Sequence, residues 1–196
     1  MIKLERLELK KLVYEDIERL VELIKNDQIK KTYMIPNYDS DEKYIRLGEH
    51  FVNLSNQEEH FIVGVYLKDY LIGFINDVEI KSGTIELGYV IDPKYKNKGY
   101  CTEALNGSIN YLFEKGFIEI VCGAFSNNIA SIRVMEKVGL ILLNKMDTIT
   151  YNGINYDCVY YSIFKGMKWW GFLGENKIYS HYLIYNLIKD NYLLIK

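Results

Sequence analysis

The stretch KNKGYCTEAL, residues 96–105, combines residue types that suit an anion site. Lys94, Lys96 and Lys98 bring ammonium groups to it, and Gly99 leaves the backbone open to close approach. The stretch lies between a predicted strand and a predicted helix, so the free amides of the first helical turn and the positive end of the helix dipole meet there. The sequence therefore predicts a phosphate cradle, with a plain polar turn as the alternative. It matches neither GxxxxGK[ST] nor GxGxxG.

Three predicted elements must position this stretch. Strand 84–91 precedes it, a helix over 100–115 contains its end, and strand 117–125 follows. A strand, helix and strand in this order predict two parallel neighbouring strands joined by a right-handed crossover. The helix is predicted from apolar residues at i, i+4, i+7 and i+8, with Gly116 as its C-terminal cap: Leu105, Ile109, Leu112 and Phe113.

The rest of the chain predicts a mixed sheet with helices on its faces, an α/β or α+β domain. The expected order is β-α-α-β-β-β-α-β-α-β-β, and Asn152-Gly153 marks a tight hairpin between the last two strands. The further elements are strand 3–10, helix 14–24, a helix after Ser40, strands 60–67 and 71–80, helix 128–138, and strands 140–150 and 154–164.

Composition indicates an ordinary globular protein. The chain has 196 residues, 49% hydrophobic and 26% charged, which suits one domain with a small appendage. No apolar run could span a bilayer, and the start MIKLERLELKK is not typical of a signal peptide, so we expect a cytoplasmic protein. A net charge of -2 argues against a nucleic-acid partner. Three cysteines without CxxC spacing and three scattered histidines favour neither a disulfide framework nor a metal site.

Residues 166–196 differ from the preceding domain, 1–165. They contain both tryptophans of the chain and follow a hairpin that would be a natural end. The segment is too apolar for a solvated tail. Three alternatives stay open: packing on the same subunit or on a homodimer mate, a disordered or aberrant extension, and a membrane-surface contact.

Three segments carry a resemblance to a known family. The strand IELGYVID, the loop PKYKNKGYCTEAL and the segment SNNIASIRVMEKVGL, in this order and spacing, resemble the GNAT superfamily of acetyl-CoA-dependent N-acetyltransferases. The resemblance is nearest to the ribosomal-protein N-terminal (RimJ/RimL-type) group, and it extends over residues 3–163. It implies a GNAT-like fold followed by the C-terminal extension. The family's loop reads Q/R-x-x-G-x-G/A, so Lys96 and Cys101 depart from it.

The resemblance implies acetyl-CoA as cosubstrate, without a metal. The loop amides and the Thr102 hydroxyl would bind its pyrophosphate. Strand 84–91 would separate from its neighbour near Val90, so that the pantetheine pairs with it and the Tyr89 or Val90 amide faces the thioester carbonyl. Asn128 would hydrogen-bond the pantetheine, which is compatible with capping the following helix. The implied cosubstrate-binding residues are Tyr89, Val90, Ile91, Lys96, Asn97, Lys98, Gly99, Tyr100, Cys101, Thr102 and Asn128.

Direct acetyl transfer to an amine needs a base and a proton donor. Glu86 lies on the implied thioester strand, on the same face as Gly88, and is the first candidate base; an exposed strand glutamate is the alternative. Asp77 is the second. Met135 occupies the position at which many family members carry a tyrosine that donates the proton to the leaving thiolate. The resemblance assigns this proton donor to Ser131 instead, which could also be a simple helix cap.

The acceptor is expected to be a primary amine. The RimJ/RimL-type resemblance favours a protein or peptide N-terminal α-amine; a small amine such as a polyamine or aminoglycoside is the alternative. A third alternative is a GNAT-like module that binds acyl-CoA without turnover. The acceptor walls are expected in 26–55 and in the final hairpin, with these candidates: Tyr33, Met34, Tyr38 and Tyr151.

Overall fold

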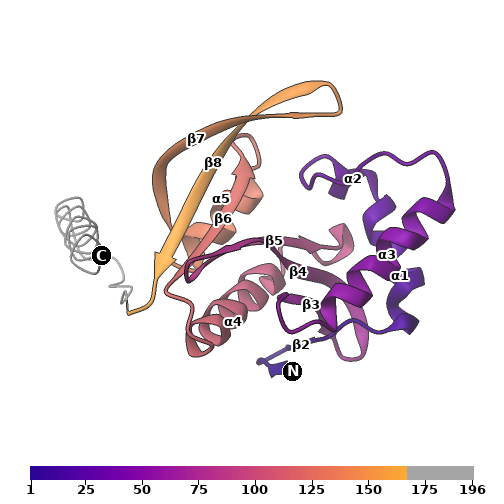
Figure 1. Cartoon of the computed structure of the whole chain (residues 1–196), viewed down its shortest axis with the longest axis horizontal. Helices are drawn as coiled ribbons and strands as arrows, with labels where there is room; N and C mark the ends of the chain where they lie inside the picture. Colours follow the sequence, from indigo (N-terminus) through magenta and orange to yellow (C-terminus); the bar gives the residue numbers. More distant parts are fainter. Residues whose placement is uncertain (167–196) are drawn as a thin grey trace.

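The computed structural model describes residues 1–166, so the predicted extension lies outside the described residues apart from its first residue (Figure 1). Eight strands form one sheet in the order β1-β2-β3-β4-β5-β6-β8-β7. Neighbouring strands are antiparallel, except that β5 and β6 are parallel. The predicted mixed sheet and the predicted parallel pairing of the two strands around α4 are therefore confirmed.

The elements follow the predicted order closely. The strands are β1 (Ile2–Lys3), β2 (Leu7–Lys10), β3 (Ile62–Leu67), β4 (Tyr70–Lys81), β5 (Thr84–Ile91), β6 (Glu119–Phe125), β7 (Ile141–Tyr151) and β8 (Ile154–Phe164). The helices are α1 (Ile17–Lys25), α2 (Asp27–Lys30), α3 (Asp41–Ser55), α4 (Tyr100–Glu114) and α5 (Ile129–Lys137), with short 3-10 turns at Tyr14–Asp16 and Pro93–Tyr95.

Two predictions near the N-terminus were wrong in detail. The single strand expected over 3–10 is two short antiparallel strands, with Ile2 opposite Leu9. The chain reverses between them because the Leu4 amide bonds back to the Leu7 carbonyl at 2.9 Å. The short helix α2 was not predicted; it begins because the Asn26 side chain accepts hydrogen bonds from its first amides.

The two faces of the sheet pack against different helices. Ile85 and Leu87 of β5 join a core that contains the buried stripe of α4 and Met135 of α5. Val90 joins a second core built from α1, α3 and the strands β3 and β4. Because successive strand residues point to opposite faces, β5 contributes to both cores, and its even-numbered residues face α1 and α3.

The last two strands form the predicted hairpin. Asn152 and Gly153 have φ angles of 50° and 76°, as a two-residue type I′ turn requires. Figure 1 shows this hairpin extending beyond the rest of the sheet, with its turn directed toward α2. Among residues 1–166, no helix has the length and apolar character to cross a bilayer.

Candidate active site

The strands β5 and β6 separate halfway along β5. Their pairing runs from Thr84 opposite Glu119 to Leu87 opposite Cys122. Beyond it, β6 remains paired only with β8. The separation predicted near Val90 therefore begins already at Gly88, and it leaves the end of β5 without a partner on this side.

Only one of the two candidate amides faces this open side. The Asp92 amide donates to the Ile72 carbonyl at 2.8 Å, one step beyond Gly73 and Ile91, the first opposite pair of the β4–β5 register. Because hydrogen-bonded and non-bonded pairs alternate in an antiparallel ladder, the Val90 amide is directed to Phe74 of β4. The Tyr89 amide is directed away from β4. Tyr89, rather than Val90, is therefore the candidate oxyanion donor.

The loop before α4 exposes backbone at the helix N-terminus. Asn97 and Gly99 have φ angles of 62° and 80°, and Gly99 is the N-cap of α4. A Cβ atom on Gly99 would lie 3.3 Å from Arg6 Nη2 and, among residues 1–166, would meet no other atom within 4 Å outside its own chain neighbours. The loop therefore combines a left-handed turn, open backbone and the positive end of a 15-residue helix, which together suit a phosphate group.

Arg6 holds this loop, and sequence reasoning missed it. Its Nε donates to Glu103 Oε2 at 2.7 Å, its backbone amide donates to Glu103 Oε1 at 2.8 Å, and its Nη1 donates to the Lys98 carbonyl at 2.9 Å. Its guanidinium also lies 4.7 Å from the centre of the Tyr100 ring. Arg6 and Glu103 are 97 residues apart, so no local pattern pointed to this contact.

The three lysines of the loop keep their charges available. In the part of the chain that the structure describes, none of Lys94, Lys96 and Lys98 forms an ion pair with a carboxylate. Asp92, the nearby acid, is buried and paired with Arg19. The net local charge at the loop is therefore positive although the whole chain is slightly acidic.

Tyr89 and Ser131 meet across the separated strands. The Tyr89 and Ser131 hydroxyl oxygens lie 2.6 Å apart, and the Ser131 amide donates to Asn128 Oδ1 at 3.3 Å. Asn128 thus caps α5, the role that was compatible with its predicted one. Burial raises the pKa of Tyr89 well above its usual range. Met135 is fully buried and has no proton to give, in keeping with the assignment to Ser131.

Glu86 is half-buried and lies on the face of the sheet that packs against α1 and α3. The alternation along β5 places it on the same face as Gly88, as predicted. A Cβ atom on Gly123 would lie 3.3 Å from Glu86 Oε1, so the carboxylate extends over the absent side chain. Burial raises the pKa of Glu86, Lys145 opposes this effect, and Glu79 and Asp147 add to it. Such a carboxyl group can accept a proton more readily than an exposed glutamate.

The second candidate base lies elsewhere. Asp77 is opposite Leu87 in the β4–β5 register, and Leu87 belongs to the core beneath α4. Residues directly opposite in a ladder share a face, so Asp77 is on the other side of the sheet from Glu86. Its carboxylate already accepts from the Phe61 amide at 2.9 Å and lies 2.8 Å from His60 Nδ1. The Asp77 carboxylate is therefore occupied by the two residues that precede β3.

Cys101 has the character of a packing residue. Burial raises the pKa of its thiol to about 12, so little thiolate forms at neutral pH. Direct transfer without a covalent cysteine intermediate fits these surroundings.

In residues 1–166, no group of three histidine, cysteine, aspartate or glutamate side chains is arranged to hold a metal ion.

One of the predicted acceptor-wall residues, Tyr33, lies on the Glu86 face of β5. The Tyr33 hydroxyl donates to Asn76 Oδ1 at 2.6 Å, and both groups lie beside Gly88, where a Cβ atom would be 3.1 Å from Asn76 and 3.2 Å from Tyr33. Met34 is half exposed. Tyr33 and Asn76 therefore border the same face of β5 that carries Glu86.

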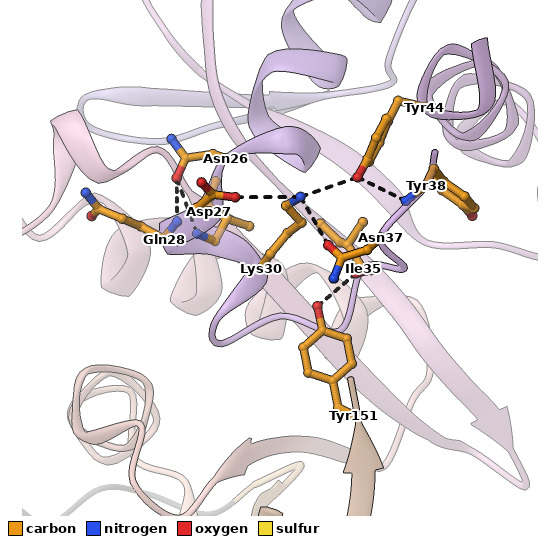
Figure 2. Close-up of polar contacts among 10 residues, drawn as sticks. Asn26, Asp27, Gln28, Lys30, Ile35, Asn37, Tyr38, Tyr44 and Tyr151 are labelled. Atoms are coloured by element: carbon orange, nitrogen blue, oxygen red, sulfur yellow. Dashed lines mark hydrogen bonds and ion pairs between the residues drawn. The ribbon is translucent and has the colours of Figure 1, made fainter. Parts of the chain in front are cut away.

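The hairpin tip is tied to the loop after α2. The Tyr151 hydroxyl donates to the Ile35 carbonyl at 2.8 Å, across 116 residues of sequence (Figure 2). Lys30 anchors this loop from the other side, with its Nζ 3.2 Å from Asn37 Oδ1 and 3.3 Å from the Tyr44 hydroxyl. The Tyr44 hydroxyl accepts from the Tyr38 amide at 3.2 Å. Tyr38 and Tyr151 thus belong to one bridge between hairpin and helices.

Comparison with known families and proteins identifies clear relatives. The family described as the acetyltransferase (GNAT) domain matches residues 6–141. The uncharacterized N-acetyltransferase YnaD of Bacillus subtilis (strain 168) is 32% identical over 162 residues, which cover 76% of this chain and 88% of YnaD. The uncharacterized N-acetyltransferase YoaA of the same organism is 28% identical over 171 residues, which cover 84% of this chain and 97% of YoaA.

Solved structures share the fold. A GNAT-family acetyltransferase from Bacillus anthracis matches with a TM-score of 0.73 and 28% identity, over 85% of this chain and 99% of that one. The ribosomal-protein-S5-alanine acetyltransferase from Vibrio fischeri matches with a TM-score of 0.71 and 18% identity, over 84% and 96%. A spermidine N-acetyltransferase from Vibrio cholerae, in complex with CoA and spermine, matches with a TM-score of 0.71 and 20% identity, over 82% and 96%. At the latter two identities the likeness is one of fold.

Proposed function

The chain belongs to the GNAT acetyltransferase family and is an N-acetyltransferase, and we propose that it transfers the acetyl group of acetyl-CoA directly to a protein or peptide N-terminal α-amine. The observation that carries this proposal is the separation of β5 from β6 beside the open loop at Gly99. An unpaired strand end next to a phosphate cradle suits a long thioester that ends in a pyrophosphate.

The residues at this place fit coenzyme A. Gly99 leaves the backbone open, the loop lysines supply positive charge, and the open side of β5 presents the Tyr89 amide. Acetyl-CoA supplies an activated acetyl group and a thiolate leaving group. Pyrophosphate binding falls to the amides from Asn97 to Thr102 and to the Thr102 hydroxyl, because the Lys96 amide already donates to the Pro93 carbonyl.

Three groups of the chain serve the chemistry. The Tyr89 amide donates to the thioester carbonyl oxygen; an oxyanion donor of this kind contributes about 3 kcal/mol in related acyl transfers. Glu86 accepts the proton that the amine loses, directly or through water. Ser131, at the N-terminal turn of α5, donates to the departing sulfur. The base and the proton donor approach from opposite faces of β5.

The proton balance favours an α-amine acceptor. At pH 7 a protein α-amine with a pKa near 8 costs about 1 kcal/mol to deprotonate, whereas a lysine-type amine near 10.4 costs roughly 4.6 kcal/mol. Glu86 is the half-buried carboxyl group on this face of β5, and its raised pKa makes it a moderate base. A moderate base is sufficient for an α-amine, because its deprotonation costs less free energy than that of a lysine-type amine.

A polyamine is the second candidate acceptor, and one feature of the site favours it. Glu79 and Asp147 lie close enough to Glu86 to raise its pKa, so the acceptor face carries several carboxylates around Lys145. Carboxylates attract an acceptor with more than one positive charge. A spermidine N-acetyltransferase shares the fold.

The proposal is tested by incubating the full chain and acetyl-CoA with three acceptor classes: peptides with free N-termini, the same peptides N-terminally blocked but carrying lysine, and polyamines. Thiol release and a mass gain of about 42 Da per acetyl group identify the acceptor. We expect the free-terminus peptides to gain mass and the blocked ones to remain unchanged. Exclusive gain on polyamines would replace the α-amine proposal. Coenzyme A binding without release for any amine would indicate a non-catalytic acyl-CoA-binding module.

A further inference from the structure

We propose that Tyr89 is a positioning residue for acetyl transfer: its side-chain hydroxyl holds the Ser131 hydroxyl in the orientation that serves the departing sulfur. This inference rests on the proposed function and extends it. Tyr89 would then act twice, through its backbone amide on the open side of β5 and through its hydroxyl at α5.

The contact bridges the place where the sheet opens. Tyr89 lies two positions beyond Leu87, the last β5 residue that is paired with β6. Ser131 lies on α5, the helix that follows β6. The hydroxyl oxygens are 2.6 Å apart, a short separation for two neutral hydroxyls. One hydrogen bond therefore connects the two sides of the proposed thioester site.

Ser131 is held from two directions. Its amide donates to Asn128 Oδ1 at 3.3 Å, which fixes the first turn of α5. Its hydroxyl contacts Tyr89, whose oxygen also lies 3.3 Å from the Ser131 carbonyl. When Tyr89 donates to Ser131 Oγ, the serine proton is free to point away from the phenol. A serine without Tyr89 would instead rotate among its staggered rotamers.

The surroundings of Tyr89 keep its hydroxyl protonated. The groups that face it are Cys101 from α4, Cys122 from β6 and Ser131 from α5. Burial raises the pKa of Tyr89, and burial also raises the pKa of both thiols. Tyr89 therefore remains a hydrogen-bond donor around neutral pH, as a positioning role requires.

The transfer balances with these groups in place. The amine nitrogen forms the C–N bond, the C–S bond breaks, and the electron pair stays on sulfur. One proton leaves the nitrogen for Glu86 and then for water. The Ser131 hydroxyl donates to the sulfur, which becomes a thiol with a proton from solvent that passes through this hydroxyl. Tyr89 neither gains nor loses a proton overall.

The test compares Tyr89→Phe, Ser131→Ala and the double variant in the full chain, with acetyl-CoA and the amine that the wild type accepts. Tyr161→Phe is the matched control, because the Tyr161 hydroxyl contacts the far end of α5 at Glu136 Oε1, 3.5 Å away. The measurements are kcat, the KM for acetyl-CoA, the Kd for coenzyme A and the melting temperature.

We expect Tyr89→Phe to lower kcat about tenfold and Ser131→Ala to lower it at least tenfold. The double variant should lose no more than Ser131→Ala alone, because residues that act as a unit are not additive. The KM and Kd should stay within about twofold of wild type, and Tyr161→Phe should match wild type. A merely structural role would shift Kd and melting temperature together with kcat.

Three results would overturn the assignment of Tyr89: a kcat for Tyr89→Phe equal to that of Tyr161→Phe, losses that multiply in the double variant, or a Kd and a melting temperature that shift together with kcat. All three results require an active wild type, so they leave the proposed acetyl transfer intact. Absence of wild-type turnover with every amine would instead refute the proposed function, and the role of Tyr89 with it.

Discussion

Replacing Arg6 by methionine should loosen the loop that is proposed to bind the pyrophosphate. The change keeps the stem of the side chain and the bond from the backbone amide to Glu103 Oε1. It removes the bonds from Nε to Glu103 at 2.7 Å and from Nη1 to the Lys98 carbonyl at 2.9 Å, together with the contact on the Tyr100 ring.

The magnitude follows from the exposure of this pair. The Arg6 side chain is 42% exposed and that of Glu103 is 15% exposed. Each lost hydrogen bond therefore costs about 0.8 kcal/mol, toward the low end of the net free energies that hydrogen bonds contribute to stability. The cation–π contact adds about 0.5 kcal/mol. The total of about 2 kcal/mol corresponds to roughly a 30-fold change in an equilibrium constant. If coenzyme A binds only the ordered loop, this cost appears in its Kd.

Isothermal titration with coenzyme A measures this effect, and Arg46→Met is the matched control. Arg46 also pairs with a glutamate, Glu42, at 2.6 Å, but its side chain is 71% exposed and the pair lies on α3. We expect Arg6→Met to raise the Kd between about tenfold and 30-fold and Arg46→Met to leave it unchanged. A Kd for Arg6→Met within twofold of wild type would refute the role of Arg6 in ordering the loop.

Three further substitutions test the loop, the base and the acceptor wall. Gly99→Val should abolish coenzyme A binding by titration, because the φ of 80° costs an L-residue about 1–2 kcal/mol and the side chain would fill the open backbone; wild-type affinity would contradict the cradle. Glu86→Gln should lower kcat/KM at least tenfold near neutral pH and should remove the acidic limb of the pH profile. In the wild type we expect this limb at a higher pH than an exposed glutamate would give, because burial raises the pKa of Glu86. An unchanged pH profile would exclude Glu86 as the base. Tyr151→Phe should raise the acceptor KM about fivefold through loss of about 1 kcal/mol at the Ile35 carbonyl, with the coenzyme A Kd unchanged. An unchanged KM would show that the bond between Tyr151 and Ile35 does not shape the acceptor site.

Local patterns were sufficient for most of the fold. Strand 84–91 was predicted with the bounds that β5 has, because its apolar run is bounded by Gly83 and Asp92. The hairpin was predicted because Asn152-Gly153 adopts positive φ at little cost. The prediction of one strand over 3–10 was wrong because the chain reverses between β1 and β2, where Arg6 binds Glu103. The alternating pattern does not reveal this tertiary contact.

The sequence by itself determined the glycine turn before α4, the crossover unit and the face that carries Glu86, because each follows from periodicity or from residue types within one short segment. Only the tertiary structure decided which amide faces the open strand edge and which side chains complete the site. Arg6 with Glu103, Tyr89 with Ser131, and Tyr151 with the Ile35 carbonyl are 97, 42 and 116 residues apart. Contacts at such separations depend on how the whole chain packs, and no local pattern records them.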